Sequence, residues 1–141
     1  MCLITTQQEP LVAEQDIRVY KSVTVKLRPI FLYGNIQYEY GKLNETTIEK
    51  SNNWCSFDDE DLTWINNHVR VENIDSPKQS KTIKCFGQGF HSCLSKEKAF
   101  KTKQTYGGLV VECLIPKGST YYTNPVGLVI SDKIIILKQI S

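Results

Sequence analysis

The segment from Leu109 to Ile115 constrains the fold more than any other part of this chain. It reads Leu-Val-Val-Glu-Cys-Leu-Ile, an apolar run interrupted by one charge. A short run of this kind is typical of a strand buried at the centre of a sheet. The turn residues Pro116, Lys117 and Gly118 follow it. We therefore expect a fold built on a sheet, with this segment as an inner strand.

A second strand is predicted over residues 17–27, where apolar and polar residues alternate. One lysine, Lys21, interrupts its apolar side, which indicates either a bulge or a position with a function. Shorter strands are predicted over residues 36–40, 83–86, 90–94, 120–122, 126–130 and 134–140. Whether Ser131 and Asp132 form a turn or part of a strand stays open at this point.

Two short helices are predicted between the strands. Residues 58–67 place acidic side chains in a first helical turn. Ser95 is a suitable cap for a helix that runs to about Thr102, with Ala99 and Phe100 facing inward. Residues 72–80 are polar and contain Pro77, which predicts an exposed loop.

The length and composition are those of one globular domain. The chain has 141 residues, of which 40% are hydrophobic and 23% are charged, so it is long enough to bury a core. We expect a single domain over residues 1–141 with an α+β fold. Its sheet should be mixed, mostly antiparallel and curved, with one or two short helices.

Charge is distributed unevenly along the chain, although the net charge is only +2. Residues 58–75 are mostly acidic, whereas residues 78–103 contain seven lysines and one glutamate. Two interpretations stay open: two solvated faces, or a local positive field that attracts an anionic ligand or a protein partner. A net charge this small does not predict a nucleic acid as partner.

The chain is expected to be cytoplasmic. Its first 15 residues lack the features of a secretory signal, and no lipid-attachment motif is present. No 18 apolar residues occur together, so no membrane span is predicted. The five cysteines follow no pattern of paired bridges, which favours reduced thiols.

The densest group of reactive residue types lies between Cys85 and Cys93. Cys85, His91, Cys93 and the distant Cys113 offer metal-ligand types, but their spacing matches no standard zinc motif, and we predict no metal ion. For Cys93 two interpretations stay open: a catalytic thiol with His91 nearby, or a buried and unreactive cysteine. Gly87 and Gly89 either let a ligand approach the backbone beside His91, or form a turn in which His91 bonds to a neighbouring strand.

Tyr121 and Tyr122 are neighbours on a predicted strand, so they point to opposite faces. One ring would pack inward, and the other is either a surface residue or a stacking platform for a base or sugar.

Four short motifs resemble a group of small proteins from gut bacteria and their phages. They are Met-Cys-Leu-Ile-Thr at the start, Gly-Phe-His-Ser from Gly89, Ile-Pro-Lys-Gly from Ile115, and Ser-Asp-Lys-Ile-Ile from Ser131. This resemblance implies no activity.

The chain also resembles the ADP-ribosyltransferase fold, mainly in its second half. Lys21 stands where that family has a basic residue on its first strand, and residues 90–93 resemble its second conserved strand. Residues 111–120 resemble a strand that ends in Pro-Lys-Gly-Thr. Asp132 stands where the family has its catalytic glutamate. The resemblance implies a fold that binds a nucleotide-like ligand without turning it over.

Three functions follow as hypotheses. The first is a non-enzymatic binding protein, without cofactor, that sequesters a nucleotide-like anionic ligand or blocks a host protein. Its predicted ligand site consists of Lys21, Gly89, His91, Ser92, Tyr121 and Asp132. The second is an ADP-ribosyltransferase-like enzyme that uses NAD, with Lys21, Ser92 and Asp132 at the cofactor. The third is a structural subunit of a larger assembly.

Overall fold

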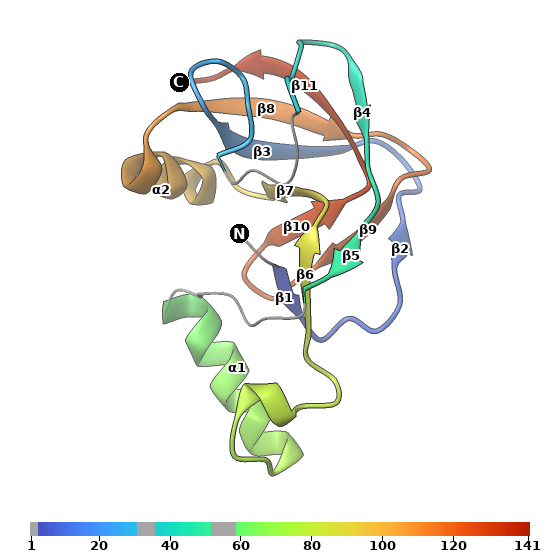
Figure 1. Ribbon diagram of the computed structural model, residues 1–141, viewed down its shortest axis with the longest axis vertical. Coiled ribbons are helices and arrows are strands. Elements are labelled where there is room, and N and C mark those ends of the chain that lie inside the picture. The colour runs from blue at the N-terminus through green and yellow to red at the C-terminus, as the bar shows by residue number, and fades with distance from the viewer. Residues whose placement is uncertain (1–2, 31–35, 52–58) are drawn as a thin grey trace.

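The computed structural model describes residues 3–30, 36–51 and 59–141, and these residues have the predicted α+β fold, made mostly of antiparallel sheet (Figure 1). The elements are β1 (Leu3–Thr5), β2 (Leu11–Val12), β3 (Ile17–Val23), β4 (Leu43–Glu45), β5 (Glu49–Lys50), α1 (Asp59–Glu72), the 3-10 helix η1 (Pro77–Gln79), β6 (Lys84–Gln88), β7 (Phe90–Cys93), α2 (Lys96–Tyr106), β8 (Leu109–Ile115), β9 (Thr120–Thr123), β10 (Leu128–Ser131) and β11 (Lys133–Gln139). Among the described helices, none is long and apolar enough to cross a membrane.

The strands form two sheets where the sequence predicted one. The larger sheet has the order β2-β9-β10-β7-β3-β8-β11-β4, and the smaller has the order β1-β6-β5. Neighbouring strands pair antiparallel in both sheets. The four short strands β1, β2, β4 and β5 carry no periodic pattern long enough to predict, because two or three residues do not establish an alternation.

The centre of the large sheet is the pair β3 and β8. Their register is continuous from Ile17 opposite Ile115 to Val23 opposite Leu109. On its other side β8 pairs with β11, so the prediction of an inner strand at Leu109–Ile115 is confirmed with the same bounds.

The strand predicted over residues 17–27 is too long. β3 ends at Val23, and the chain then turns, with the Leu27 amide donating to the Thr24 carbonyl at 2.9 Å. Leu27 has a positive φ of 58°, which is incompatible with a strand. Apolar and polar residues continue to alternate after Val23, although the backbone is no longer extended as a strand there.

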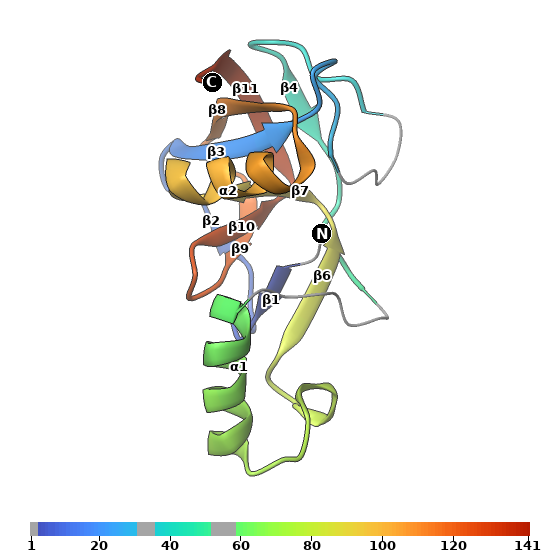
Figure 2. The ribbon, with the colours of Figure 1, turned by 90° about the vertical axis from the view of Figure 1, so that its left-hand side faces the viewer.

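The two faces of the large sheet bury separate apolar clusters. One face holds the inner cluster, which includes Val19, Val23, Tyr38, Phe90 and Val129. The opposite face packs against α2, which lies across β3 and β8 in two perpendicular views (Figures 1 and 2). The predicted helix from Ser95 is confirmed: the Ser95 side chain caps it, and Ala99 is buried, but the helix continues past Thr102 to Tyr106.

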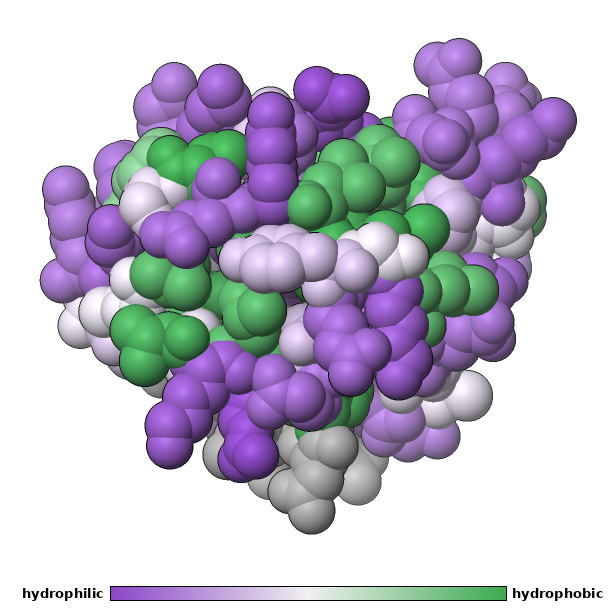
Figure 3. All heavy atoms as spheres, turned by 90° about the horizontal axis from the view of Figure 1, so that it is seen from above, coloured by the Kyte–Doolittle hydropathy of each residue, from purple (hydrophilic) through white to green (hydrophobic). Residues whose placement is uncertain are grey.

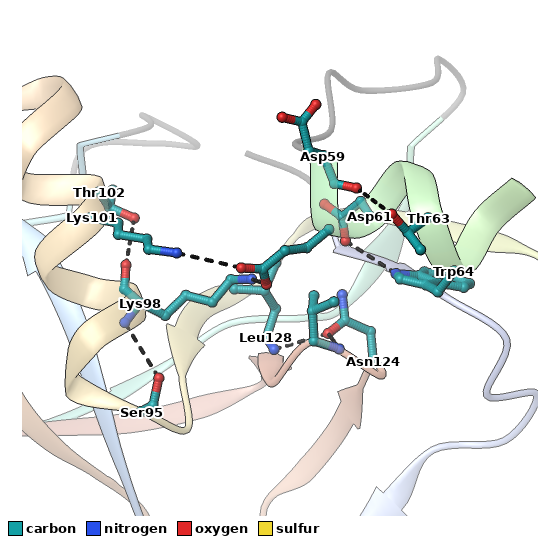
Figure 4. A network of polar contacts seen from close by, with 12 residues as sticks. Asp59, Asp61, Thr63, Trp64, Ser95, Lys98, Lys101, Thr102, Asn124 and Leu128 are labelled. Atoms are coloured by element: carbon teal, nitrogen blue, oxygen red, sulfur yellow. Dashed lines mark hydrogen bonds and ion pairs between the residues drawn. The ribbon is translucent and has the colours of Figure 1, made fainter.

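Helix α1 projects away from the large sheet beside β1 and β6 (Figure 2). Its Ile65 packs with Ile4 and Ile83, and this small cluster attaches the helix to the three-stranded sheet. The Glu60 carboxylate also accepts from the ammonium groups of Lys98 and Lys101 of α2 at 2.7 and 3.4 Å (Figure 4). The helix predicted over residues 58–67 therefore exists but extends to Glu72, and Asp58 lies outside the described residues.

Two further predictions need correction. Residues 36–40 form no strand: Tyr38 is buried in the inner cluster, and Tyr40 makes one isolated bridge to Ile136. The polar loop over residues 72–80 contains η1, which begins at Pro77. Proline is common at the first position of a helix because it has no amide hydrogen to satisfy there.

Candidate functional site

A hollow opens where β3 and β7 separate. Its walls come from β3, the residues before and along β7, the segment that follows β3, and α2. The residues that line it are Lys21, Ser22, Pro29, Ile30, Ile36, Tyr38, Gly89, Phe90, His91, Ser92, Cys93 and Thr102. Its volume is about 50 Å³ when measured as the space open to the centre of a water-sized sphere, and about 590 Å³ when all space between its atoms is counted, open solvent included.

The hollow exists because β3 and β7 are barely paired. In the described chain, Tyr20 opposite Cys93 is the one residue pair that joins these two strands. If the register continued, Lys21 would lie opposite Ser92 and Ser22 opposite His91. Across this gap the Lys21 ammonium donates to the His91 carbonyl at 2.6 Å. A side chain of β3 thus bonds to the backbone of β7 where the two strands are not paired.

Lys21 is a buried cation on the apolar face of β3. It is 8% exposed, and its neighbours on that face, Val19 and Val23, are fully buried. Its ammonium nitrogen lies 5.9 Å from the centre of the Tyr38 ring, a cation–π contact. Among the described residues, no carboxylate lies within 4.0 Å of it. Burial lowers the pKa of Lys21 below its usual value.

Ser92 lies on the same face as Lys21. It pairs with Val129 of β10, a member of the inner cluster, and the register at Tyr20 and Cys93 places it opposite Lys21. Ser92 is 4% exposed, and its buried hydroxyl has no hydrogen-bond partner in the described structure. A buried hydroxyl without a partner is costly, so this position calls for an explanation.

His91 and Gly89 position β7. Burial lowers the pKa of His91 to about 3, so its imidazole is neutral, and Nε2 donates to the Gly87 carbonyl at 3.0 Å. Gly89 joins β6 to β7 with a φ of 142°, and a Cβ there would lie 2.5 Å from Cγ1 of Ile130. Of the two interpretations of this segment, the described contacts match the turn, in which the His91 imidazole bonds to the Gly87 carbonyl.

Tyr121 and Asp132 are not among the residues that line the hollow. Tyr121 lies in β9 opposite Ser131 and packs against the inner cluster. Asp132 forms the turn between β10 and β11, where its carboxylate accepts from the Thr120 amide at 2.9 Å. The structure thus brings together Lys21, Gly89, His91 and Ser92 of the predicted site. The transferase hypothesis needs Asp132 beside Lys21 and Ser92, and the structure does not place it there.

The cysteines do not form a reactive centre in the described residues. Cys93 and Cys113 are free, buried thiols, and burial raises their pKa values to about 11 and about 12. A thiol with a raised pKa is a weak nucleophile at neutral pH. No group of three or more metal-ligand side chains occurs in the part of the chain that the structure describes. Cys2 and Cys55 lie outside it.

The apolar wall of the hollow was not predicted from the sequence. Pro29, Ile30, Ile36 and Tyr38 come from the segment after β3, of which residues 36–40 were assigned to a short strand.

Comparison of the chain with models of protein families, with curated proteins and with solved structures found no match.

Proposed function

We propose that this protein binds a small molecule whose anionic end enters the hollow between β3 and β7. The observation that carries the proposal is the buried ammonium of Lys21, which faces no carboxylate among the described residues. An unpaired buried charge costs several kcal/mol. An anionic ligand group beside Lys21 would offset that cost, so binding energy is available at this position.

Ser92 supports the same proposal. Its unpartnered hydroxyl lies on the same face of the sheet as Lys21, and both residues line the hollow. A ligand oxygen between them would accept one hydrogen bond from each. Hydrogen bonds that involve a charged group are the stronger ones in proteins.

The proposed role is binding rather than catalysis. The imidazole of His91 is neutral and bonded to the Gly87 carbonyl, and the Cys93 thiol is protonated at neutral pH. The hollow thus offers the Lys21 ammonium and the unpartnered Ser92 hydroxyl for recognition, which suits a protein that sequesters its ligand. The nucleotide-like ligand expected from the sequence belongs to this anionic class.

A thermal-shift screen tests the proposal. The wild-type protein would be compared with Lys21→Met and with Lys81→Met, an exposed lysine outside the hollow. The ligands would be NAD, ADP-ribose, linear and cyclic nucleotides, inorganic phosphate and small carboxylates. A ligand at one hundred times its dissociation constant stabilises the fold by about 2.7 kcal/mol.

We expect at least one anion to stabilise the wild type and Lys81→Met but not Lys21→Met. If no anion stabilises the wild type, the proposal fails, and a protein partner becomes the better hypothesis. If Lys21→Met responds as the wild type does, the hollow is not the binding site.

A further inference from the structure

We infer that the group bound at Lys21 and Ser92 is a carboxylate and that the ligand is a monocarboxylic acid with a compact apolar body. This inference rests on the proposed function and narrows it to one ligand class. The charges, the remaining hydrogen-bonding groups and the walls of the hollow each point to this class.

The charge of the hollow matches one carboxylate. Lys21 is the single cation among the residues that line it, because the imidazole of His91 is neutral. A phosphate monoester carries a charge of about −1.5 to −2 near neutral pH and has three strongly accepting oxygens. A carboxylate carries one negative charge on two oxygens. One buried ammonium therefore compensates a carboxylate fully and a phosphate only in part.

The donors match the two carboxylate oxygens. Lys21 has three ammonium hydrogens, and one of them is used by the His91 carbonyl. The Ser92 hydroxyl has one hydrogen and no partner in the described structure. Two ammonium hydrogens of Lys21 and the hydroxyl hydrogen of Ser92 thus remain, which is enough to give each carboxylate oxygen at least one hydrogen bond.

Three other polar side chains of the hollow, those of Ser22, His91 and Thr102, are already engaged. The Ser22 hydroxyl donates to the Ala99 carbonyl at 2.6 Å, and the Thr102 hydroxyl donates to the Lys98 carbonyl at 3.3 Å. The His91 Nε2 is bonded to the Gly87 carbonyl. A ribose or a base would place its hydroxyl and amino groups against these occupied partners, and burying polar groups without partners is unfavourable.

The walls and the size of the hollow suit an apolar body. Pro29, Ile30, Ile36, Tyr38 and Phe90 line the hollow with apolar surface. A water-sized group needs roughly 10–15 Å³ of this volume, and the hollow measures about 50 Å³. The hollow therefore has room for the three heavy atoms of a carboxylate beside Lys21 and Ser92, and the apolar body would lie against the apolar walls.

Four compounds with the same phenyl ring but different polar groups test whether the hollow prefers a carboxylate: benzoate, neutral benzamide, benzenesulfonate and phenylphosphonate. Acetate tests the need for an apolar body, and AMP tests the nucleotide. Binding would be measured by calorimetric titration of the wild type, Lys21→Met, Ser92→Ala and the control Lys81→Met. We expect benzoate to bind about tenfold or more tightly than the other five compounds, since one charge-assisted hydrogen bond contributes about that factor.

Lys21→Met should abolish the preference for benzoate over benzamide, Ser92→Ala should weaken benzoate binding severalfold, and Lys81→Met should leave it unchanged. Tighter binding of phenylphosphonate or AMP, lost in Lys21→Met, would overturn the carboxylate while the proposed function stands. Binding that is equal in the wild type, Lys21→Met and Ser92→Ala would overturn both. If Lys21→Met does not fold, the Ser92→Ala titration decides, because that variant removes a single oxygen.

Discussion

Lys21 and Glu112 are both buried charges at the centre of the large sheet, but they have opposite surroundings. Glu112 of β8 is 7% exposed, and its carboxylate faces the guanidinium of Arg18 at 3.3 Å and the ammonium of Lys138 at 3.8 Å. Lys21 of β3 is 8% exposed and faces a carbonyl and an aromatic ring. Tyr20 is opposite Glu112 in the register, so Lys21 lies on the other face of the sheet.

This difference in surroundings distinguishes Glu112, whose charge is paired within the fold, from Lys21, whose charge has no such partner among the described carboxylates. Glu112 has two cations within the fold, and its burial is compensated without help from another molecule. Lys21 has none among the described carboxylates, so an anion supplied from outside would complete its surroundings. The same contrast separates the two serines of this region: the Ser22 hydroxyl is bonded to the Ala99 carbonyl, whereas the Ser92 hydroxyl is unpartnered in the described structure.

Reversing the charge of Glu112 should have the largest effect on stability. In Glu112→Lys, a buried ammonium would face Arg18 and Lys138, and we expect a loss of about 3–5 kcal/mol in the free energy of unfolding. Urea denaturation measures this loss. The neutral Glu112→Gln should cost only about 1 kcal/mol, because the partners Arg18 and Lys138 are largely exposed and solvated. A charge reversal that costs less than the neutral change would contradict the compensating role of these two cations.

Acid should destabilise the Lys21 side of the sheet through His91. Its pKa is about 3 in the folded protein, against an ordinary value of 6.5. Between these values the unfolded chain binds a proton that the folded protein does not, so stability falls as the pH is lowered through this window. We expect the free energy of unfolding to drop by about 2 kcal/mol between pH 7 and pH 5.

Urea denaturation at the two pH values checks this drop. His91→Gln, which keeps a donor for the Gly87 carbonyl, should reduce it, whereas His68→Gln in α1 should not. An equal drop in His91→Gln and the wild type would show that another group is responsible. Glu72 is not this group. Hydrogen bonds from Ser80 and Thr82 lower the pKa of Glu72 in the folded protein, so the stability that this carboxylate contributes is lost only at lower pH.

Removing the charge of Lys21 should change stability by less than about 1 kcal/mol. Lys21→Met keeps the volume of the side chain and removes an uncompensated buried charge, which is favourable. It also leaves the His91 carbonyl without its donor, which is unfavourable by a similar amount. Urea denaturation without ligand measures the balance. A loss of several kcal/mol would mean that the ammonium is compensated within the protein, and the contrast with Glu112 would disappear.

The two serine-to-alanine variants should have small effects of opposite sign. Ser92→Ala removes an unpartnered buried hydroxyl and should stabilise the protein by about 0.5 kcal/mol. Ser22→Ala removes the donor to the Ala99 carbonyl and should destabilise it by about 1 kcal/mol. Both would be compared with the wild type by denaturant unfolding in one buffer. Destabilisation by Ser92→Ala would indicate that its hydroxyl is bonded within the protein.

Part of this arrangement was visible in the pattern of residues. The interruption of an apolar strand face marked Lys21, and the two glycines marked the segment that leads to β7. Tyr121 was assigned to the same site as a ring on which a base or sugar could stack, and Asp132 was assigned to it through the resemblance to the ADP-ribosyltransferase fold. In the structure one of them packs on the inner cluster and the other bonds to the Thr120 backbone. Residue type alone does not distinguish a residue that binds a ligand from one that packs in the core or bonds to the backbone.

The surface at the end formed by β4 and β11 was equally unpredictable. Seen from above, apolar side chains lie there between polar ones (Figure 3), and Leu43 of β4 is exposed. The pairing of β4 with β11 joins segments about ninety residues apart, such as Asn44 and Ile134. No pattern within either segment indicates that partner.

Short-range patterns were sufficient for the inner strand Leu109–Ile115, the capped helix at Ser95 and the α+β class, because each depends on residues within one turn or one strand. The candidate site depends on contacts across the fold. Lys21 bonds to a carbonyl 70 residues away, and the unpartnered state of Ser92 follows from which side chains surround it. Burial, strand separation and hydrogen-bond satisfaction are properties of the packed chain, so the candidate site emerged from the tertiary structure, whereas the strands that hold it followed from local alternation of residue types.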